Sequence, residues 1–282
     1  METLPPHVRS ALQPHLSGAR TPRVGFLTGA GISSESGIPT FRGPEGYWTV
    51  GSKVYHPMEL ATNAAFREDP WEVWRWYLYR EATCRESVPN AAHLSMSELA
   101  KLNTQEPLPL MTQNVDGLHR RADFPVEDLF EIHGSIGLMR CAERCSMETI
   151  DLTLKLTSAE EAHTLSQNEM SDILRCPKCN GLARPHVLWF DEYYEEALFR
   201  SESALRALDG VDVLITVGTS AATNLPVQTV QRALSRNATI LDINPGDESP
   251  FGEAAERYGG AWWRATACEA LPELAQAFRT LF

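Results

Sequence analysis

Short apolar segments of strand length recur along the chain, and each of them ends in small or polar residues. Segments of this kind lie at residues 23–28, 107–114, 128–135, 211–220 and 238–245, and we expect a last strand at 261–266. Residues 269–278, EALPELAQAF, have helical periodicity. Strands that alternate with helices predict an α/β fold, in which a parallel sheet carries helices on both faces.

The residues that follow these segments indicate a ligand. In an open parallel sheet, ligands bind outside the carboxyl ends of the strands. Five such ends carry glycine or polar side chains, which is more than a purely structural sheet requires. They are Gly29-Ala30-Gly31, Gln113-Asn114, His133-Gly134, Gly218-Thr219-Ser220 and Asn244-Pro245.

The first of these ends lies in GFLTGAGISSESGIPTFRG, residues 25–43, and begins like the phosphate turn of a dinucleotide site. Gly29, Ala30 and Gly31 can let backbone N–H groups approach a pyrophosphate. The third glycine of that fingerprint is missing, because Ser34 stands where it would open the helix. The loop therefore differs from that of an ordinary dinucleotide-binding enzyme.

Composition and charge exclude several classes of function. The net charge of −12 disfavours a nucleic-acid partner, because phosphate binding depends mainly on Lys and Arg. No apolar run approaches the roughly 20 residues that span a bilayer, so no membrane partner is expected. Residues 1–23 lack a secretory apolar core, which favours a cytoplasmic location. Their arginines give a weak mitochondrial transit signal, which Glu2 and the prolines oppose; we expect a short helix at 4–16.

Four of the six cysteines form two close pairs, Cys141 with Cys145 and Cys176 with Cys179. Four thiolates can complete a tetrahedral zinc site and leave no open position for catalysis, so the pairs predict one structural zinc ion. Cys84 and Cys268 stand outside these pairs and are interpreted as inert buried thiols. The acidic residues 146–175 between the pairs are expected to form a solvated insertion.

Two segments interrupt the alternation of strands and helices. Residues 47–87 are helical and rich in aromatic side chains, and residues 138–184 hold the cysteine pairs. We expect them to form a small domain, made of a helical module and a zinc-binding module. The large domain would then comprise residues 1–46, 88–137 and 185–282.

The motifs resemble one family when they are taken in order. TGAGIS and GIPTFRG are followed by TQNVDGLH, EIHGS, the two cysteine pairs, RPHVLWFDE, GTS and INP. This series is similar to that of the sirtuins, the NAD-dependent protein-lysine deacylases, from about Gly25 to the C-terminus. The resemblance implies a Rossmann-like large domain beside the small one, with NAD and an acyl-lysine peptide in the cleft between them. NAD would be consumed as a co-substrate, with release of nicotinamide and O-acyl-ADP-ribose.

The resemblance also implies which residues bind NAD. The loop from Ser33 to Arg42 would cover the ribose and the nicotinamide. Gln113, Asn114 and Asp116 would hydrogen-bond the carboxamide and the ribose hydroxyls, although the Asn-x-Asp-Gly stretch alone is typical of a plain turn. The full predicted set is Gly29, Ala30, Gly31, Ser33, Phe41, Arg42, Gln113, Asn114, Asp116, Gly218, Thr219, Ser220, Asn244 and Cys268.

His133 in EIHGS is the implied general base, and Asn114 and Asp116 complete the implied catalytic set. The base would deprotonate a ribose hydroxyl after the acyl oxygen has displaced nicotinamide, and a histidine suits this step because its pKa lies near working pH. Val187–Phe190 would pair with the substrate peptide as an added strand. His186 would take a structural or peptide-edge role.

A finer prediction concerns EDPWEVWRWYLYREA, residues 68–82. The sequence predicts a helix that begins at Pro70, with Asp69 as its N-cap and Glu72 completing a capping box. Tyr77 and Arg80 share a face of it, and spacing alone favours a core tyrosine beside a solvated arginine. In one sirtuin class, however, such a Tyr-x-x-Arg pair reads the distal carboxylate of succinyl- or malonyl-lysine. Ala61 matches the small residue that makes room for the longer acyl chain, so the resemblance implies a succinyl and malonyl preference over acetyl.

Three other functions stay open. An NAD-dependent dehydrogenase is opposed by the missing third glycine, and an idle zinc-containing binding module by the presence of His133, Asn114 and Asp116. Mono-ADP-ribosyl transfer would use the same NAD chemistry with another nucleophile. One departure from the family is the spacing of Cys141 and Cys145, with three intervening residues where two are usual, and three still suits zinc. We expect a monomer that acts on acylated-lysine proteins or peptides.

Overall fold

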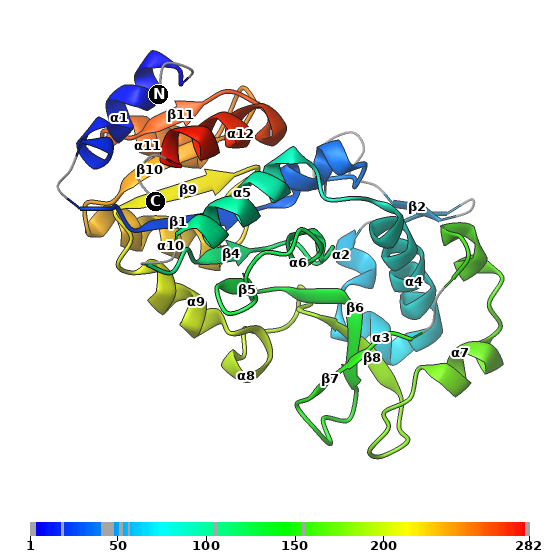
Figure 1. Cartoon of the computed structure of the whole chain (residues 1–282). Helices are drawn as coiled ribbons and strands as arrows, with labels where there is room; N and C mark the ends of the chain where they lie inside the picture. Colours follow the sequence, from blue (N-terminus) through cyan, green and yellow to red (C-terminus); the bar gives the residue numbers. More distant parts are fainter. Residues whose placement is uncertain are drawn as a thin grey trace.

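A six-stranded sheet forms the centre of the larger part of the molecule, in the order β11-β10-β9-β1-β4-β5 (Figure 1). The computed structural model describes residues 4–17, 20–40, 48–50, 53–55, 57–103, 106–153 and 156–279, with the backbone alone at 48–50, 53–55, 57 and 58. Every neighbouring pair of strands in the sheet is parallel. The strands are β1 (Val24–Thr28), β4 (Leu110–Thr112), β5 (Leu129–Glu131), β9 (Val213–Val217), β10 (Thr239–Ile243) and β11 (Ala261–Trp263). Each of them lies within a segment that the sequence predicts as a strand.

The strand order indicates where a ligand would bind. From β1 the chain proceeds through β4 and β5 to one edge of the sheet, and then through β9, β10 and β11 to the other edge. The direction of progress therefore reverses between β1 and β9, and a doubly wound sheet binds its ligand at such a reversal. This order is that of the Rossmann-like fold that the resemblance implies.

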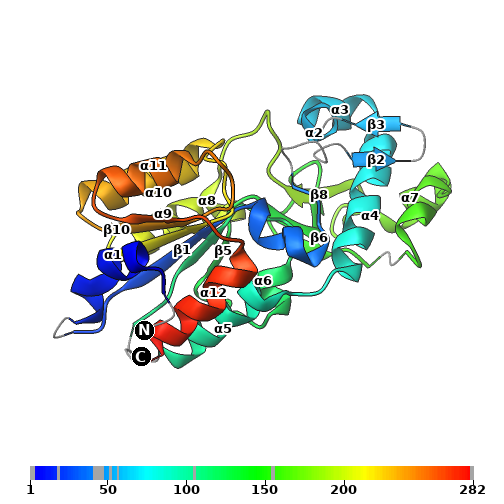
Figure 2. The same cartoon turned by 90° about the horizontal axis from the view of Figure 1, so that it is seen from above.

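Helices cover both faces of the sheet, as predicted (Figures 1 and 2). Alternate residues of a strand point to opposite faces. Phe26 and Ile215 accordingly pack in one core with α1 (Pro6–Leu16), α5 (Ala91–Leu102) and α12 (Ala267–Phe278). Leu27 and Leu214 pack in a second core with α9 (Ser201–Leu208), α10 (Asn224–Ser235) and α11 (Pro250–Arg257). The helix α1 confirms the one expected at residues 4–16.

Two further modules lie at the end of the molecule away from α1 (Figure 2). One contains the antiparallel pair β2 (Trp48–Val50) and β3 (Lys53–Tyr55), followed by α2 (Pro57–Leu60), α3 (Asn63–Glu68) and α4 (Pro70–Glu86). The other contains the antiparallel strands β6 (Gly134–Cys141), β7 (Thr149–Asp151) and β8 (Ala183–Val187), with η2 (Ala159–His163) and α7 (Gln167–Ile173). Short helices η1 (Ala30–Ser36), α6 (Leu118–Arg121) and α8 (Glu196–Phe199) lie in the connections.

The two modules share a core of their own, separate from the two cores of the sheet. Trp74 and Leu78 of α4 pack there with apolar residues of β6 and β8. Ala162 and Met170, from the acidic stretch 146–175, are also fully buried in it. The prediction of a solvated insertion is therefore wrong. Its acidic side chains alternate with apolar ones that cover α4, and the charge obscured this in the sequence.

The helix α4 begins at Pro70, and the side chain of Asp69 caps it by accepting from the N–H groups of Trp71 and Glu72, both at 3.0 Å. The predicted capping box is wrong. The N–H of Asp69, which Glu72 would have to satisfy, already donates to the carbonyl of Ala65 at the end of α3. Among the described residues, no helix combines the length and the apolar content that crossing a membrane requires.

Candidate active site

The glycine turn after β1 packs directly on the turn after β9. A Cβ atom at Gly31 would lie 2.7 Å from the Cα of Gly218, and one at Gly29 would lie 2.7 Å from the Gly218 carbonyl oxygen. The N–H groups of Gly29 and Gly31 donate to the carbonyls of Val217 and Gly218, at 3.0 and 2.9 Å. These two glycines are thus required for contact between two backbones, in addition to any role toward a pyrophosphate.

The 3-10 helix η1 explains why Ser34 can stand where a dinucleotide fingerprint has glycine. The chain winds tightly from Ala30 to Ser36 and leaves this turn at Gly37, with φ +84°. The hydroxyl of Ser34 donates to the carbonyl of Gly31 at 2.8 Å, within the same turn. Phe41 and Arg42 lie outside the described residues, so their contacts with NAD stay predictions.

A polar network joins the ends of β1 and β4. Asn114 donates through Nδ2 to the carbonyl of Gly29 at 3.1 Å and to the hydroxyl of Ser33 at 3.2 Å. The Ser33 hydroxyl donates to Asp116 at 2.8 Å, and the second carboxylate oxygen of Asp116 accepts from the N–H of Leu118 at 2.8 Å. Burial raises the pKa of Asp116, against the lowering effect of these hydrogen bonds. The structure thus brings Ser33, Asn114 and Asp116 together, as the sequence predicts.

Gln113 ties the end of β4 to the end of β9. Its Nε2 donates to the hydroxyl of Thr219 at 2.8 Å, and its Oε1 accepts from the hydroxyl of Thr223 at 2.9 Å. Asn244, after β10, donates to the carbonyl of Thr219 at 3.3 Å. Three predicted NAD residues therefore meet at the carboxyl edge of the sheet, and Thr223 is a partner that the sequence did not single out.

Two predicted cofactor residues lie at the margin of this region. Ser220 is exposed, one position beyond the buried Thr219. Cys268 is half-buried at the start of α12, and its N–H donates to the carboxylate of Glu35 at 3.1 Å. Glu35 thereby joins η1 to α12.

Two buried histidines lie behind the network. The rings of His93 and His119 are 4.8 Å apart, and Nε2 of His119 lies 3.1 Å from the hydroxyl of Thr28. Burial lowers the pKa of His93 to about 4 and lowers that of His119 as well. Both rings are therefore neutral at pH 7. They lie in the core, where they contact Thr28 and Ser33 from the inner side of the site.

His133 follows β5, and the chain turns at Gly134, with φ +84°, into β6. The segment 128–135, which the sequence predicts as one strand, is thus divided between two sheets at the histidine. Its Nδ1 lies 2.9 Å from the carbonyl oxygen of Gln113. Burial lowers the pKa of His133 to about 4, and the bond to the Gln113 carbonyl opposes this effect. This pKa is lower than the value near working pH that the sequence led us to expect, because the ring is buried. The imidazole is neutral at pH 7, and with its lone pair it can act as a base.

Tyr194 contacts His133 directly, and the sequence did not single it out. Its hydroxyl lies 2.9 Å from Nε2 of His133, and the two rings stack with centroids 6.0 Å apart. Burial raises the pKa of Tyr194 to about 12. No local sequence signal could have placed it there, because 61 positions separate the two residues.

Tyr77 and Arg80 are both buried on α4, with exposed fractions of 1% and 3%. The sequence-based alternative of a solvated arginine is therefore wrong. The indole Nε1 of Trp189 donates to the Tyr77 hydroxyl at 2.9 Å, and the Arg80 guanidinium lies 5.6 Å from the centroid of the Tyr77 ring. Burial raises the pKa of Tyr77 to about 12 and lowers that of Arg80. Ala61 is buried in the same core.

The segment Val187–Phe190, predicted to pair with a peptide, has its amide groups occupied. The N–H of Leu188 donates to the carbonyl of His133 at 2.9 Å, and that of Phe190 donates to the carbonyl of Ala61 at 3.0 Å. The N–H of Trp189 donates to Glu192 at 3.1 Å. Strand addition at these three amides would require their present bonds to break. The side chain of Phe190 itself is exposed, at 57%.

His186 lies inside the protein. Its ring stacks on Phe199 with centroids 5.4 Å apart, and its Nδ1 lies 3.3 Å from the Arg140 guanidinium. Burial, with the charges of Arg140 and Arg184, lowers its pKa to about 4. Of the two roles left open by the sequence, its position suits the structural one.

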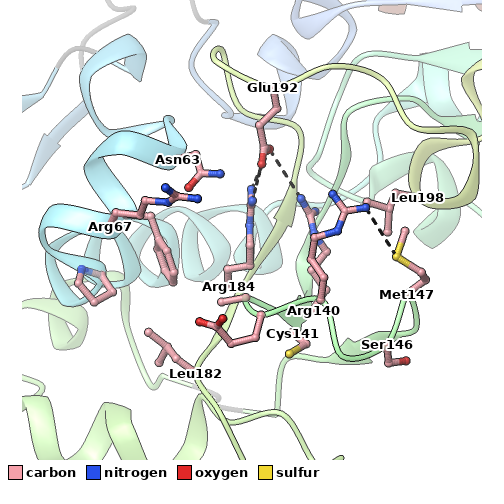
Figure 3. Close-up of a pocket in the computed structure, with 15 residues that line it drawn as sticks. Asn63, Arg67, Arg140, Cys141, Ser146, Met147, Leu182, Arg184, Glu192 and Leu198 are labelled. Atoms are coloured by element: carbon pink, nitrogen blue, oxygen red, sulfur yellow. Dashed lines mark hydrogen bonds and ion pairs between the residues drawn. The ribbon is translucent and has the colours of Figure 1, made fainter. Parts of the chain in front are cut away.

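Residues 188–195, here called the 188–195 loop, connect β8 to α8 and are fixed by ion pairs. Glu192 lies between two arginines of the zinc-binding module (Figure 3). It contacts Arg184 at 2.5 and 2.9 Å and Arg140 at 3.6 Å. Glu195 contacts Arg144 at 2.9 and 2.6 Å. A cavity of about 590 Å³ opens beside these pairs, and none of the residues predicted to bind NAD lines it.

The four paired cysteines form one cluster, with all sulfur atoms within 4.8 Å of one another. Cys141 and Cys179 are 3.6 Å apart at Sγ, and Cys145 and Cys176 are 3.4 Å apart. A tetrahedral zinc ion with Zn–S bonds of about 2.3 Å separates its sulfurs by about 3.8 Å, so the cluster fits this ion. Amide hydrogen bonds from Cys179 and Lys178 lower the pKa of Cys176, which favours its thiolate, whereas hydrogen bonds to the other three sulfurs raise the pKa of Cys145. The prediction of a structural zinc site is confirmed.

Comparison with known proteins agrees with this geometry. The profile of the Sir2 family matches residues 29–224. The chain belongs to the Sir2 family. It is 35% identical over 252 residues to an NAD-dependent protein deacylase of Leptospira interrogans, with 89% of this chain and 91% of the relative covered. It is 34% identical over 252 residues to the mitochondrial NAD-dependent protein deacylase sirtuin-5 of Danio rerio, with 86% and 79% covered.

Solved Sir2 structures share the fold and have bound nucleotide. A Sir2 homologue in complex with NAD has a TM-score of 0.74 and 33% identity, with 98% of this chain and 94% of that chain covered. Another, in complex with 2′-O-acetyl ADP-ribose, has a TM-score of 0.76 and 34% identity, with 96% of both chains covered. The chain is thus an NAD-dependent protein deacylase of the sirtuin type, and NAD and a structural zinc ion are its cofactors.

Proposed function

We propose that this sirtuin removes succinyl and malonyl groups from protein lysine in preference to acetyl groups, and releases nicotinamide and O-acyl-ADP-ribose. The observation that carries the acyl preference is the buried pair of Tyr77 and Arg80 beside Trp189. The observation that carries the reaction is His133 at the carboxyl edge of the sheet, next to the network of Gln113, Asn114 and Asp116.

His133 is the proposed general base. In the first step, the acyl oxygen of the modified lysine attacks the ribose carbon, and the glycosidic bond to nicotinamide breaks. In the second, His133 takes the proton of a ribose hydroxyl, whose oxygen closes on the imidate carbon. The lysine amine then departs with the proton, and water adds to the cyclic cation that remains, which loses a proton and opens to O-acyl-ADP-ribose. The bond from Nδ1 to the Gln113 carbonyl fixes the tautomer, so that Nε2 is the basic atom.

The acyl preference follows from two buried donors on one face of α4. The Tyr77 oxygen already accepts a hydrogen bond from Trp189, so its own proton is available to an acceptor. A guanidinium and a phenol can together bind one carboxylate in a dry pocket. A succinyl or malonyl group carries that carboxylate and an acetyl group does not. Ala61 is buried in the same core, and its small side chain would obstruct the longer chain less than a larger residue would.

The proposed test offers the enzyme NAD and three matched peptides that carry succinyl-, malonyl- or acetyl-lysine. We expect free lysine and O-acyl-ADP-ribose from all three, with kcat/KM at least about tenfold lower for acetyl. An equal or higher value for acetyl would contradict the carboxylate-reading role. ADP-ribose attached to protein, without free lysine, would instead support mono-ADP-ribosyl transfer. No observation on this chain favours that alternative.

A further inference from the structure

Tyr194 and His133 form a pair whose hydrogen-bond direction can be worked out. The carbonyl of Gln113 can only accept, so Nδ1 of His133, 2.9 Å away, carries the proton. With a pKa of about 4, the imidazole is neutral near pH 7, and its Nε2 therefore carries the lone pair. The Tyr194 hydroxyl, 2.9 Å from Nε2, is the donor to it. This phenol stays protonated, because burial raises its pKa to about 12.

Three kinds of contact hold Tyr194 in place before substrate binds. Its ring stacks on His133 at an interplanar angle of 27°. It also packs against the apolar core shared by Phe130 and Ile132. The 188–195 loop that carries it is tied to the zinc-binding module through Glu192, two positions before it, and Glu195, one position after it. The Tyr194 hydroxyl is thus held in hydrogen-bond contact with Nε2 of His133, and the two ion pairs hold the backbone of the loop.

We propose that the Tyr194 hydroxyl is the resting partner of the base, and that the ribose hydroxyl of the substrate has to replace it on Nε2 of His133. This inference rests on the proposed role of His133. Nε2 of a neutral imidazole has one lone pair, and a general base needs that lone pair for the proton it removes. Because the loop is clamped, the replacement occurs by rotation of the tyrosine side chain.

The proton balance of the step is simple. When the ribose hydroxyl has taken the place of Tyr194, its O–H bond breaks and an N–H bond forms at Nε2. The ribose oxygen forms a C–O bond to the imidate carbon while the π pair of its C=N bond moves to the nitrogen. The imidazole of His133 becomes an imidazolium that later returns the proton to the departing amine. Tyr194 keeps its own proton throughout. It is a positioning residue that acts through His133, and it sets how readily substrate reaches the base.

The test is Tyr194→Phe, which keeps the ring that packs and stacks and removes the hydroxyl alone. Tyr193→Phe is the matched control, because Tyr193 lies in the same loop with an exposed fraction of 89%. We expect Tyr194→Phe to raise kcat/KM for deacylation about two- to tenfold through a lower KM for NAD, the factor that one neutral hydrogen bond represents. The control should match wild type. A gain in activity cannot come from a damaged fold.

Other results would overturn the proposal. A fall in deacylation with nicotinamide exchange preserved would mean that the hydroxyl itself carries the proton. Identical kinetics in Tyr194→Phe and wild type would mean that it is a bystander. A failure of the proposed function looks different, since wild type would then form no free lysine, or His133→Ala would deacylate as wild type does.

A spectroscopic measurement tests the exchange without turnover. In protein labelled with ¹⁵N-histidine, the Nε2 resonance of His133, assigned with His133→Ala, should move in Tyr194→Phe and not in Tyr193→Phe. ADP-ribose carries the ribose hydroxyls and serves as the probe. When it is bound, we expect the His133 signals of wild type and Tyr194→Phe to coincide. If they remained apart, the tyrosine hydroxyl would still occupy Nε2 and the proposal would be wrong.

Discussion

Trp189 donates a hydrogen bond from its indole Nε1 to the hydroxyl of Tyr77, at 2.9 Å, in the core between α4 and the end of β8. This bond uses an acceptor position of the phenol and directs the phenol proton elsewhere. Trp189 lies at the start of the 188–195 loop, and Tyr77 lies three positions from Arg80 on α4. The bond therefore fixes the orientation of a donor at the place where the acyl chain is proposed to bind.

The first prediction concerns Arg80→Met. We expect it to lower kcat/KM for desuccinylation by roughly a hundredfold or more, because the charge-assisted bonds to the distal carboxylate are lost. Deacetylation should change little, since acetyl offers no partner to the arginine. Both rates are measured on matched peptides at the same NAD concentration.

Arg75→Met is the control for this variant. Arg75 lies on the same helix and pairs with Glu72 in a half-exposed position, 3.5 Å away. It should leave both activities near wild type. An equal fall of the two activities in Arg80→Met would contradict the carboxylate-reading role, because it would indicate general damage to the site.

His133→Ala should leave the fold intact and abolish deacylation, because the base that deprotonates the ribose hydroxyl is lost. Exchange of labelled nicotinamide into NAD should partly survive, since the first step does not use this base. The two reactions are followed in parallel on one preparation. Near-normal deacylation, with NAD binding preserved, would refute the assignment.

The sequence predicts this site well where a motif is local and poorly where the chain returns from far away. Ser33, Asn114 and Asp116 could be expected to meet because they follow neighbouring parallel strands. Tyr194 could not, since its ring reaches His133 only after β6, β7 and β8 have formed the zinc-binding module between them.

Competition for backbone groups explains another difference. A capping box at Glu72 is good local chemistry, but α3 already uses the N–H of Asp69. The same competition bears on Val187–Phe190, where peptide pairing stays a prediction, because His133, Ala61 and Glu192 accept from three of its amides. A pattern that is local cannot show which distant carbonyl or carboxylate satisfies an N–H group first.

Zinc removal tests the structural role of the four-cysteine cluster. Cys176→Ser should lose the metal and destabilise the zinc-binding module, because metal binding is coupled to folding. Arg140 and Arg144 adjoin the ligands Cys141 and Cys145 and hold Glu192 and Glu195, so we also expect the 188–195 loop to lose its anchors. Elemental analysis should give one zinc per chain for wild type and for Cys268→Ser, the matched control. Wild type purified without metal would disprove the assignment.

The last prediction is a pH dependence of stability that comes from Asp242. This buried carboxylate of β10 accepts hydrogen bonds from the hydroxyls of Thr216 and Ser249. Burial raises its pKa to about 6, against the lowering effect of those bonds. Between the unfolded value of 3.8 and about 6, the folded state therefore binds more protons than the unfolded state. Asp242 therefore makes its full contribution to the free energy of unfolding below pH 3.8, and this contribution is lost as the pH rises through about 6.

Asp242→Asn removes this dependence, because an amide of the same shape can bond both hydroxyls without carrying a charge. The free energy of unfolding of the variant, relative to wild type, should rise by about 2 kcal/mol between pH 4 and pH 7. The stability of Asp212→Asn relative to wild type should change with pH in the opposite direction. The hydrogen bond from Arg20 lowers the pKa of Asp212, so the contribution of Asp212 to stability is lost as pH falls. Urea unfolding at several pH values measures both differences. A relative stability of Asp242→Asn that stays constant over this range would show that Asp242 titrates like an ordinary carboxyl group.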